Sequence, residues 1–369
     1  MSTQAFAGVV AIVGGVIIAV LAFVPMAAVT YRRRGQLTRR DLANLLVSAV
    51  YGLSLWTYTL LPLPASDDFE CREAITRPEQ VLDIIRAHPH HTLLDLARNP
   101  MVMQIALNVA LFVPLGVLLR VQARRGVFTA AAVGLAVSLA IEVTQHTGLW
   151  GIYDCAYRYF DISDLISNPT GAVVGSVLAA VVVGRRPDPL PRVTPRLTRG
   201  RRVVALVSDL LVIALLGSLT VVLWRAWQFL GITETSPLIA QRQALIQWGL
   251  PLAVQTISVL GWGTTIGERV VQVRTQAQRQ AWTLPARLIK LGTGVGALAV
   301  LGAGVIPGSG WLLVGLTTAH LTAVAMPGGR GLSNTLARLD LVLDSPTGPF
   351  AGGSPSTPVG TDGQMGSDR

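Results

Sequence analysis

The sequence predicts an all-α polytopic membrane protein with about nine transmembrane helices in two bundles. The 369-residue chain has a mean hydropathy of +0.53, and 14% of its residues are charged, as in membrane proteins rather than soluble globules. Its apolar residues form runs close to the roughly 20 residues that a helix needs to cross a bilayer. Its basic residues separate these runs, so the high isoelectric point does not indicate binding to nucleic acid.

Each apolar run is expected to be helical, because lipid offers no hydrogen bonds to an open backbone. The first run has no basic residue before it and is too long for a signal-peptide core, which predicts an uncleaved first helix. The expected spans are residues 6–29, 42–61, 101–119, 127–146, 165–184, 203–223, 244–263, 288–306 and 311–326.

The basic residues also predict an orientation in the cell membrane. With the N-terminus outside and the helices alternating, the inside segments contain 23 Lys and Arg residues and the outside segments contain 7. The positive-inside rule therefore favours an outside N-terminus and a cytoplasmic C-terminus. The longest outside segment, residues 62–100, carries seven acidic residues, which agrees with this orientation.

The chain is expected to contain two membrane modules, residues 1–184 with five helices and residues 202–344 with four. Between them, residues 185–201 are basic and contain four prolines, which predicts a stiff cytoplasmic linker that could hold anionic lipid. Residues 345–369 are of low complexity and are expected to be disordered.

The first module keeps several polar residues at membrane depth. Glu142 and Gln145 are three residues apart and share one helix face, and the segment RYFDISDLISNPTG occupies residues 158–171. In the predicted orientation these side chains lie toward the outer leaflet. They form a candidate outward-facing polar pocket made of Asn108, Glu142, Gln145, Arg158, Asp161, Asp164 and Asn168.

Several interpretations of this polar pocket remain open. A charge at bilayer depth costs roughly 2.5–3.5 kcal/mol, so the acids need water or a partner, and Arg158 is the simplest partner. In a purely structural alternative, Asp161 caps the next helix and Asp164 meets the helix dipole. Oxygen ligands could also bind Mg²⁺ or Ca²⁺, or carboxyl groups could act on a phosphate-bearing lipid. Because no metal, cofactor or nucleophile motif is recognisable, we predict no metal and no cofactor and favour a non-enzymatic role.

These motifs resemble the VanZ-like family over about residues 45–184. The motif N-x-x-L-F-x-P-x-G begins at Asn108, E-x-x-Q at Glu142 and R-x-F-D-I-x-D-L-I-x-N-x-x-G at Arg158. The resemblance implies a bacterial cell-envelope protein with low-level resistance to glycopeptide antibiotics such as teicoplanin. The expected partners of the protein are membrane lipid and an envelope ligand or small ion. The alternatives are a transporter of a small ion or solute and a lipid-directed membrane enzyme.

The second module has its own charged residues. Arg202 and Asp209 are seven residues apart and therefore share a helix face. Asp209 would either bond to a neighbouring helix or a long arginine, or belong to an ion or proton pathway. The pattern R-x-x-A-x-x-x-D and the segment GWGTTIGERVVQVRT, which includes Arg269, resemble the RDD family over about residues 200–345. The family implies a membrane function such as transport, but Asn334 replaces an expected aspartate here.

Two cysteines, Cys71 and Cys155, fall in predicted outside segments. Because the outside is oxidising, they could form a disulfide between the long loop and the loop that carries the RYFDISDLISNPTG motif. The alternative is two free thiols.

Overall fold

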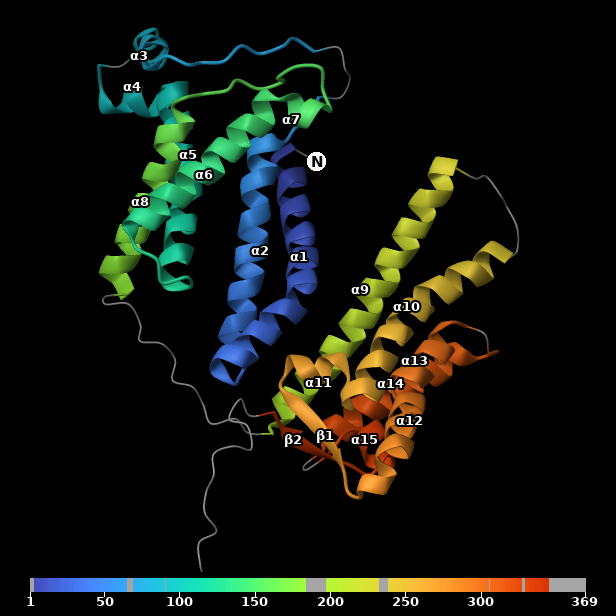
Figure 1. The fold of residues 1–369 in the computed structure, drawn as a ribbon. Coiled ribbons are helices and arrows are strands. Elements are labelled where there is room, and N and C mark those ends of the chain that lie inside the picture. Colours follow the sequence, from blue (N-terminus) through green and yellow to red (C-terminus); the bar gives the residue numbers. More distant parts are fainter. Residues whose placement is uncertain are drawn as a thin grey trace, which may run out of the picture. The chain divides into compact units, whose positions relative to one another are not determined.

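The structure is a computed structural model that describes residues 3–64, 69–89, 91–183, 197–231, 238–304, 306–326 and 329–344. Seven helical stretches of the described residues are long and apolar enough to cross a membrane, which confirms the predicted all-α polytopic class (Figure 1). They match seven of the nine predicted spans; the helices at 42–61 and 311–326 are present but do not combine that length with that hydropathy. The chain divides into two compact units, Met1–Val193 and Thr194–Arg369, and each is described by itself. The predicted tail and residues 185–196 of the predicted linker lie outside the described residues.

The first unit has a long helix at each of its five predicted spans. The helices α1 and α2 pack against each other, and α8 packs along both α5 and α6 (Figure 1). A capping box formed by Thr38 and Asp41 starts α2, and Asp41 also pairs with Arg34 at 2.6 Å. The five helices are α1 (Thr3–Arg34), α2 (Arg39–Leu60), α5 (Pro100–Val121), α6 (Val127–His146) and α8 (Asp164–Val183).

Glycines allow α5 and α8 to approach closely. A Cβ atom on Gly175 would meet the carbonyl oxygen of Val113, and one on Gly116 would meet the carbonyl oxygen of Ala172. Small residues at such crossings let helix backbones pack tightly inside a membrane. This close crossing places the polar residues of α5 opposite those of α8.

One end of the first unit carries its short helices and long loops. The helices α3 (Pro78–Arg86), α4 (Leu93–Arg98) and α7 (Gly148–Gly151) lie at the end where α2 and α6 stop and α5 begins (Figure 1). We call it the loop-bearing end. The sequence interpretation treated residues 62–100 as loop, because two amphipathic helices this short lack the length of a membrane span.

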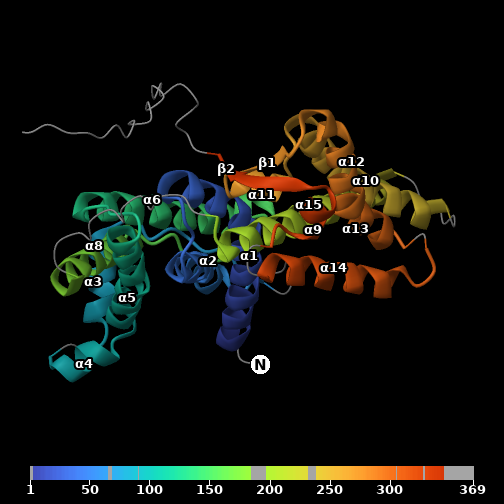
Figure 2. The same cartoon turned by 90° about the horizontal axis from the view of Figure 1, so that it is seen from below.

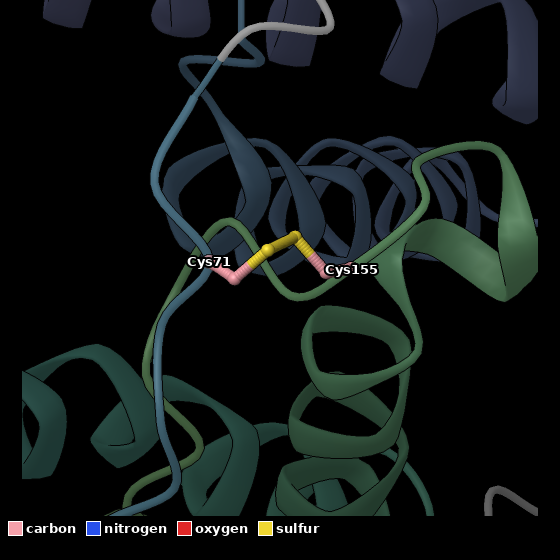
Figure 3. Close-up of a disulfide and its surroundings, with 2 residues drawn as sticks. All are labelled: Cys71 and Cys155. Atoms are coloured by element: carbon pink, nitrogen blue, oxygen red, sulfur yellow. A yellow bond between two sulfur atoms is a disulfide. The ribbon is translucent and has the colours of Figure 1, made fainter.

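A disulfide joins the two loops of this end. Cys71 and Cys155 are bonded, with their Cα atoms 5.7 Å apart (Figure 3). Beside the disulfide, the N–H of Ile75 donates to the carbonyl of Phe160 at 2.7 Å, and Ile75 forms a parallel bridge with Asp161. The loop after α2 is therefore held against the loop that leads into α8.

The second unit is also mainly helical. Its long helices are α9 (Arg199–Gly231) and α10 (Leu238–Trp262). The predicted span at 288–306 overlaps the stretch Gln280–Gly302, which is long and apolar enough to cross a membrane. Within this stretch Gly294 separates α12 (Thr283–Thr293) from α13 (Val295–Gly302), and α14 (Ser309–Ala325) follows. The short helices are α11 (Ile266–Val270) and α15 (Leu332–Leu336).

A small sheet was not predicted. The strands β1 (Val273–Ala277) and β2 (Leu339–Leu343) pair antiparallel, with Val273 opposite Leu343 (Figure 2). Each strand has five residues and carries charged side chains, so neither produces a long apolar run. The pairing joins the segment that follows α11 to the segment that follows α15.

Candidate functional site

A cavity of about 820 Å³ lies at the loop-bearing end of the first unit, among α2, α5, α6 and α8. This volume is in the range of small-molecule sites, about 300–1,000 Å³. Glu142 is behind the wall and only 1% exposed. The other six residues of the predicted polar pocket line the cavity: Asn108, Gln145, Arg158, Asp161, Asp164 and Asn168.

Glu142 and Asp161 shape the entry into α8. The backbone N–H of Asp161 donates to Oε2 of Glu142 at 3.0 Å. Oδ1 of Asp161 accepts from the backbone N–H of Ser163 at 2.8 Å, in the turn just before α8 begins at Asp164. Gln104 completes the arrangement by donating from Nε2 to Oδ2 of Asp161 at 3.3 Å. These two acids are therefore hydrogen-bonded within the protein.

Asp164 is the acid that the cavity exposes to a ligand. It is half-buried, and its Oδ1 accepts from Nδ2 of Asn108 at 2.5 Å. The backbone carbonyl of Asp164 accepts from Oγ of Ser138 at 3.0 Å, and Nδ2 of Asn168 donates to the same Oγ at 2.9 Å. One polar network thus joins α5, α6 and α8 at the floor of the cavity.

The expected pairing of Arg158 with these acids is wrong. Nη2 of Arg158 donates to the carbonyl of Leu61 at 2.6 Å, and none of the ion pairs among the described residues includes Arg158. The last carbonyls of a helix have no partner within the helix. Arg158 therefore binds a carbonyl at the end of α2 instead of an acid.

Three cavity residues donate hydrogen bonds to the carbonyls at the end of α2. Gln145 donates to the carbonyl of Thr59 at 2.8 Å, and the hydroxyl of Tyr157 donates to the carbonyl of Leu60 at 3.0 Å. Arg158 donates to the next carbonyl along the chain, that of Leu61. Burial raises the pKa of Tyr157 above its ordinary value, so this hydroxyl remains a neutral donor.

Several cavity residues were missed in the sequence. Gln104 is four residues before Asn108 on the same helix, so helical spacing could have identified it. Ser138, which bonds to Asp164 and Asn168 but does not line the cavity, is likewise four residues before Glu142. Arg72 gave no such signal, because the neighbouring disulfide brings it to the cavity. Its guanidinium lies 5.3 Å from the ring centroid of Tyr159 and donates to that residue's hydroxyl at 3.2 Å.

The lining therefore combines two carboxylates, four neutral amides and two arginines. Amides both donate and accept hydrogen bonds, whereas arginine only donates and an ionised carboxylate only accepts. Such a lining suits a polar ligand with both kinds of group. Within the part of the chain that the structure describes, no group of three or more His, Cys, Asp or Glu side chains is placed to hold a metal ion.

The second unit has a separate buried polar cluster around Asp209. The carboxylate accepts from Thr265 at 2.6 Å, and from Gln255 and the N–H of Gly267 at 2.7 Å each. Asp209 therefore bonds to a neighbouring helix, as one of the two interpretations expected. Asp209 and Arg202 both line a cavity of about 80 Å³ in this unit.

The second unit also contains the predicted charge Arg269 and an ion pair that was not predicted. Arg269 lies over the ring of Trp262, 4.3 Å from its centroid. Lys290, the single lysine of the chain, pairs with Glu268 at 2.5 Å and is 1% exposed. Asn334 donates to the other oxygen of Glu268 at 2.9 Å. The sequence interpretation missed this pair because the two residues are 22 positions apart and no local pattern connects them.

Comparison with known proteins identifies the region that contains the polar cavity. Residues 48–183 match the model of the VanZ/LLP1 family, and this stretch contains all seven residues of the predicted pocket. No curated protein and no solved structure matches the chain. The resemblance of residues 200–345 to the RDD family remains a prediction. The protein is embedded in a membrane through its apolar helices, and over residues 48–183 it is similar to the VanZ/LLP1 family.

Proposed function

We propose that the VanZ-like region binds a polar ligand of the cell envelope at the outer face of a bacterial cytoplasmic membrane. Through this binding it lowers sensitivity to glycopeptide antibiotics modestly. The observation that carries the proposal is the cavity of about 820 Å³, with two acids, several amides and two arginines in its walls. The antibiotic part rests on the VanZ-like resemblance.

Two observations support an outward-facing cavity. The loop-bearing end carries the acid-rich segment 62–100 and a disulfide, which persists in oxidising compartments. The opposite end carries the basic residues of segments 32–40 and 120–125, as the cytoplasmic end of a membrane protein does. Charge and redox chemistry therefore favour the same orientation.

Antibiotic susceptibility tests the proposal. The chain would be expressed in a glycopeptide-susceptible bacterium, and the minimum inhibitory concentration of teicoplanin would be measured at matched protein levels. We expect the wild type to raise this concentration and Asp164→Asn to return it to the vector level. Asp154→Asn is the matched control, because Asp154 is exposed on the preceding loop and does not line the cavity. Equal effects of the two variants would contradict a role for the cavity.

A second candidate function is transport of a small ion or solute by the second unit. The buried charges Asp209 and Lys290 favour it, because both lie in helical stretches that can cross a membrane, and charges at membrane depth commonly mark ion or proton pathways. The RDD resemblance points the same way. Purified protein in vesicles with a pH-sensitive dye would test it: an imposed sodium gradient should change the internal pH in the wild type and not in Asp209→Asn. No change in the wild type would contradict this candidate.

A further inference from the structure

The first unit has a second hollow, which is apolar and distinct from the polar cavity. It is a groove of about 370 Å³ between α3, α5 and α8, and no residue lines both hollows. Each of the three helical segments contributes two aliphatic side chains to its walls. These are Val81 and Leu82 of α3, Ile105 and Val109 of α5, and Ile162 and Ile166 at the start of α8.

Two buried serines line this groove, and their hydroxyls have no partner among the described residues. Ser163 is 9% exposed and Ser167 is 4% exposed, and neither Oγ has a hydrogen-bond partner among the described residues. The nearby hydroxyl of Thr170 differs, since it donates to the carbonyl of Ile166 at 2.6 Å. A buried hydroxyl without a partner is unfavourable. The groove therefore offers two hydrogen-bond donors for which no described residue supplies an acceptor.

The position of these hydroxyls indicates which molecule could accept from them. Ser163 and Ser167 flank the first turn of α8, a membrane-spanning helix that starts at the loop-bearing end. At the first turn of a membrane-spanning helix we expect the bilayer to pass from headgroups to hydrocarbon. A glycerolipid carries its ester carbonyls at this level, with its acyl chains directly below. An ester carbonyl accepts hydrogen bonds and donates none, as the two serines require.

We infer that this groove binds one ester-linked acyl chain of a membrane glycerolipid, with Ser163 and Ser167 donating to its ester carbonyl. The aliphatic walls hold the chain, and α3 covers it from the water side, where Leu82 is 49% exposed. An ether-linked lipid offers the same hydrocarbon without the carbonyl. The site should therefore prefer the ester over the ether. This inference is independent of the ligand proposed for the polar cavity.

Photolabelling of the full chain in vesicles tests the inference. The probe is a trace of diester phosphatidylglycerol with a diazirine in one acyl chain, and the bulk lipid is either diester or diether phosphatidylglycerol. Diester bulk lipid should compete for the groove. Because one net hydrogen bond corresponds to about a fivefold change in affinity, labelling of residues 162–170 should be about fivefold higher in diether than in diester bulk. Labelling of α1, where Val13 and Ile17 are exposed, should not depend on the bulk lipid.

Serine variants separate the hydrogen bonds from simple lipid contact. The double variant Ser163→Ala with Ser167→Ala should bring the diether-to-diester ratio to about one. Ser176→Ala is the matched control, because this serine is also buried and unpartnered in α8 but does not line the groove. It should keep the wild-type ratio. If the double variant is misfolded by size-exclusion chromatography, the two single variants replace it.

Two results would overturn the inference. A wild-type ratio of one at residues 162–170 would indicate ordinary surrounding lipid rather than an ester site. An unchanged ratio in the folded serine variants would show that the hydroxyls do not recognise the ester. As a second readout, Val109→Trp fills the groove and should abolish labelling of residues 162–170 while labelling of α1 persists.

Discussion

The close crossing of α5 and α8 predicts a large effect of a single methyl group at Gly171. A Cβ at this position would meet the carbonyl oxygen of Val109, the carbonyl carbon of Val109 at 2.9 Å and Cβ of Phe112 at 3.0 Å. Backbone atoms cannot rotate away as a flexible side chain can, so Gly171→Ala must separate the two helices. Because Val109 is next to Asn108, the separation should also lengthen the hydrogen bond from Asn108 to Asp164.

The magnitude follows from three contributions. Overpacking of a tight interface costs about 1–3 kcal/mol. A weakened hydrogen bond between membrane helices adds about 0.6 kcal/mol, with an upper value of about 1.7 kcal/mol. The better helix propensity of alanine returns about 0.5–1 kcal/mol. Gly171→Ala should therefore lower the free energy of unfolding by about 1–3 kcal/mol.

The same substitution in an open position provides the control. Gly52 in α2 has nothing within 4 Å of a built Cβ, so Gly52→Ala should stabilise the protein by about 0.5–1 kcal/mol. Both variants would be unfolded in mixed micelles by titration with sodium dodecyl sulfate, followed by far-UV circular dichroism. If Gly171→Ala is neutral or stabilising, α5 and α8 do not approach as described, and the argument from packing to the cavity is refuted.

The remaining predictions concern the other contacts. A double-mutant cycle with Asn108→Leu and Asp164→Leu should give a coupling of about 0.6–1.7 kcal/mol by the same unfolding assay, and additive effects would contradict the hydrogen bond between them. In the second unit, Lys290→Met should cost about 3–5 kcal/mol because it leaves a buried acid unpaired, whereas adding Glu268→Gln should recover most of the loss; equal stability of the single and double variants would exclude the ion pair. Denatured protein should react with a maleimide polymer only after reduction, at two sites, and Cys71→Ser should lower stability by about 2–5 kcal/mol. Labelling before reduction would show that the disulfide is absent.

Much of the helical fold could be predicted from the sequence because each membrane helix satisfies its own backbone. An apolar run of sufficient length therefore specifies a helix without knowledge of its neighbours. The span expected at 288–306 shows the limit, because a break at Gly294 divides it into α12 and α13. The strands β1 and β2 lie about 65 residues apart and depend on a tertiary pairing that no local pattern encodes.

The cavity was predicted in part for a similar reason. Polar residues within apolar runs stand out, which identified Asn108, Glu142 and Gln145. The partner of Arg158 could not be identified in this way. Opposite charge favoured an acid, but the unpaired carbonyls at the end of α2 lie closer and bind the guanidinium. Such capping depends on which helix end the loop with Arg158 reaches. The disulfide between Cys71 and Cys155 helps to hold this loop in place.

Cysteine accessibility tests most directly whether the polar cavity is outward-facing. Tyr159→Cys places a thiol on an exposed residue that lines the cavity, and Ala123→Cys places one in the exposed loop between α5 and α6 at the opposite end. Intact cells would be treated with a membrane-impermeant maleimide before and after permeabilisation, with the wild type as the unlabelled control. We predict that Tyr159→Cys is labelled on intact cells and Ala123→Cys only after permeabilisation. The reverse pattern would place the cavity on the cytoplasmic side and contradict the proposed envelope function.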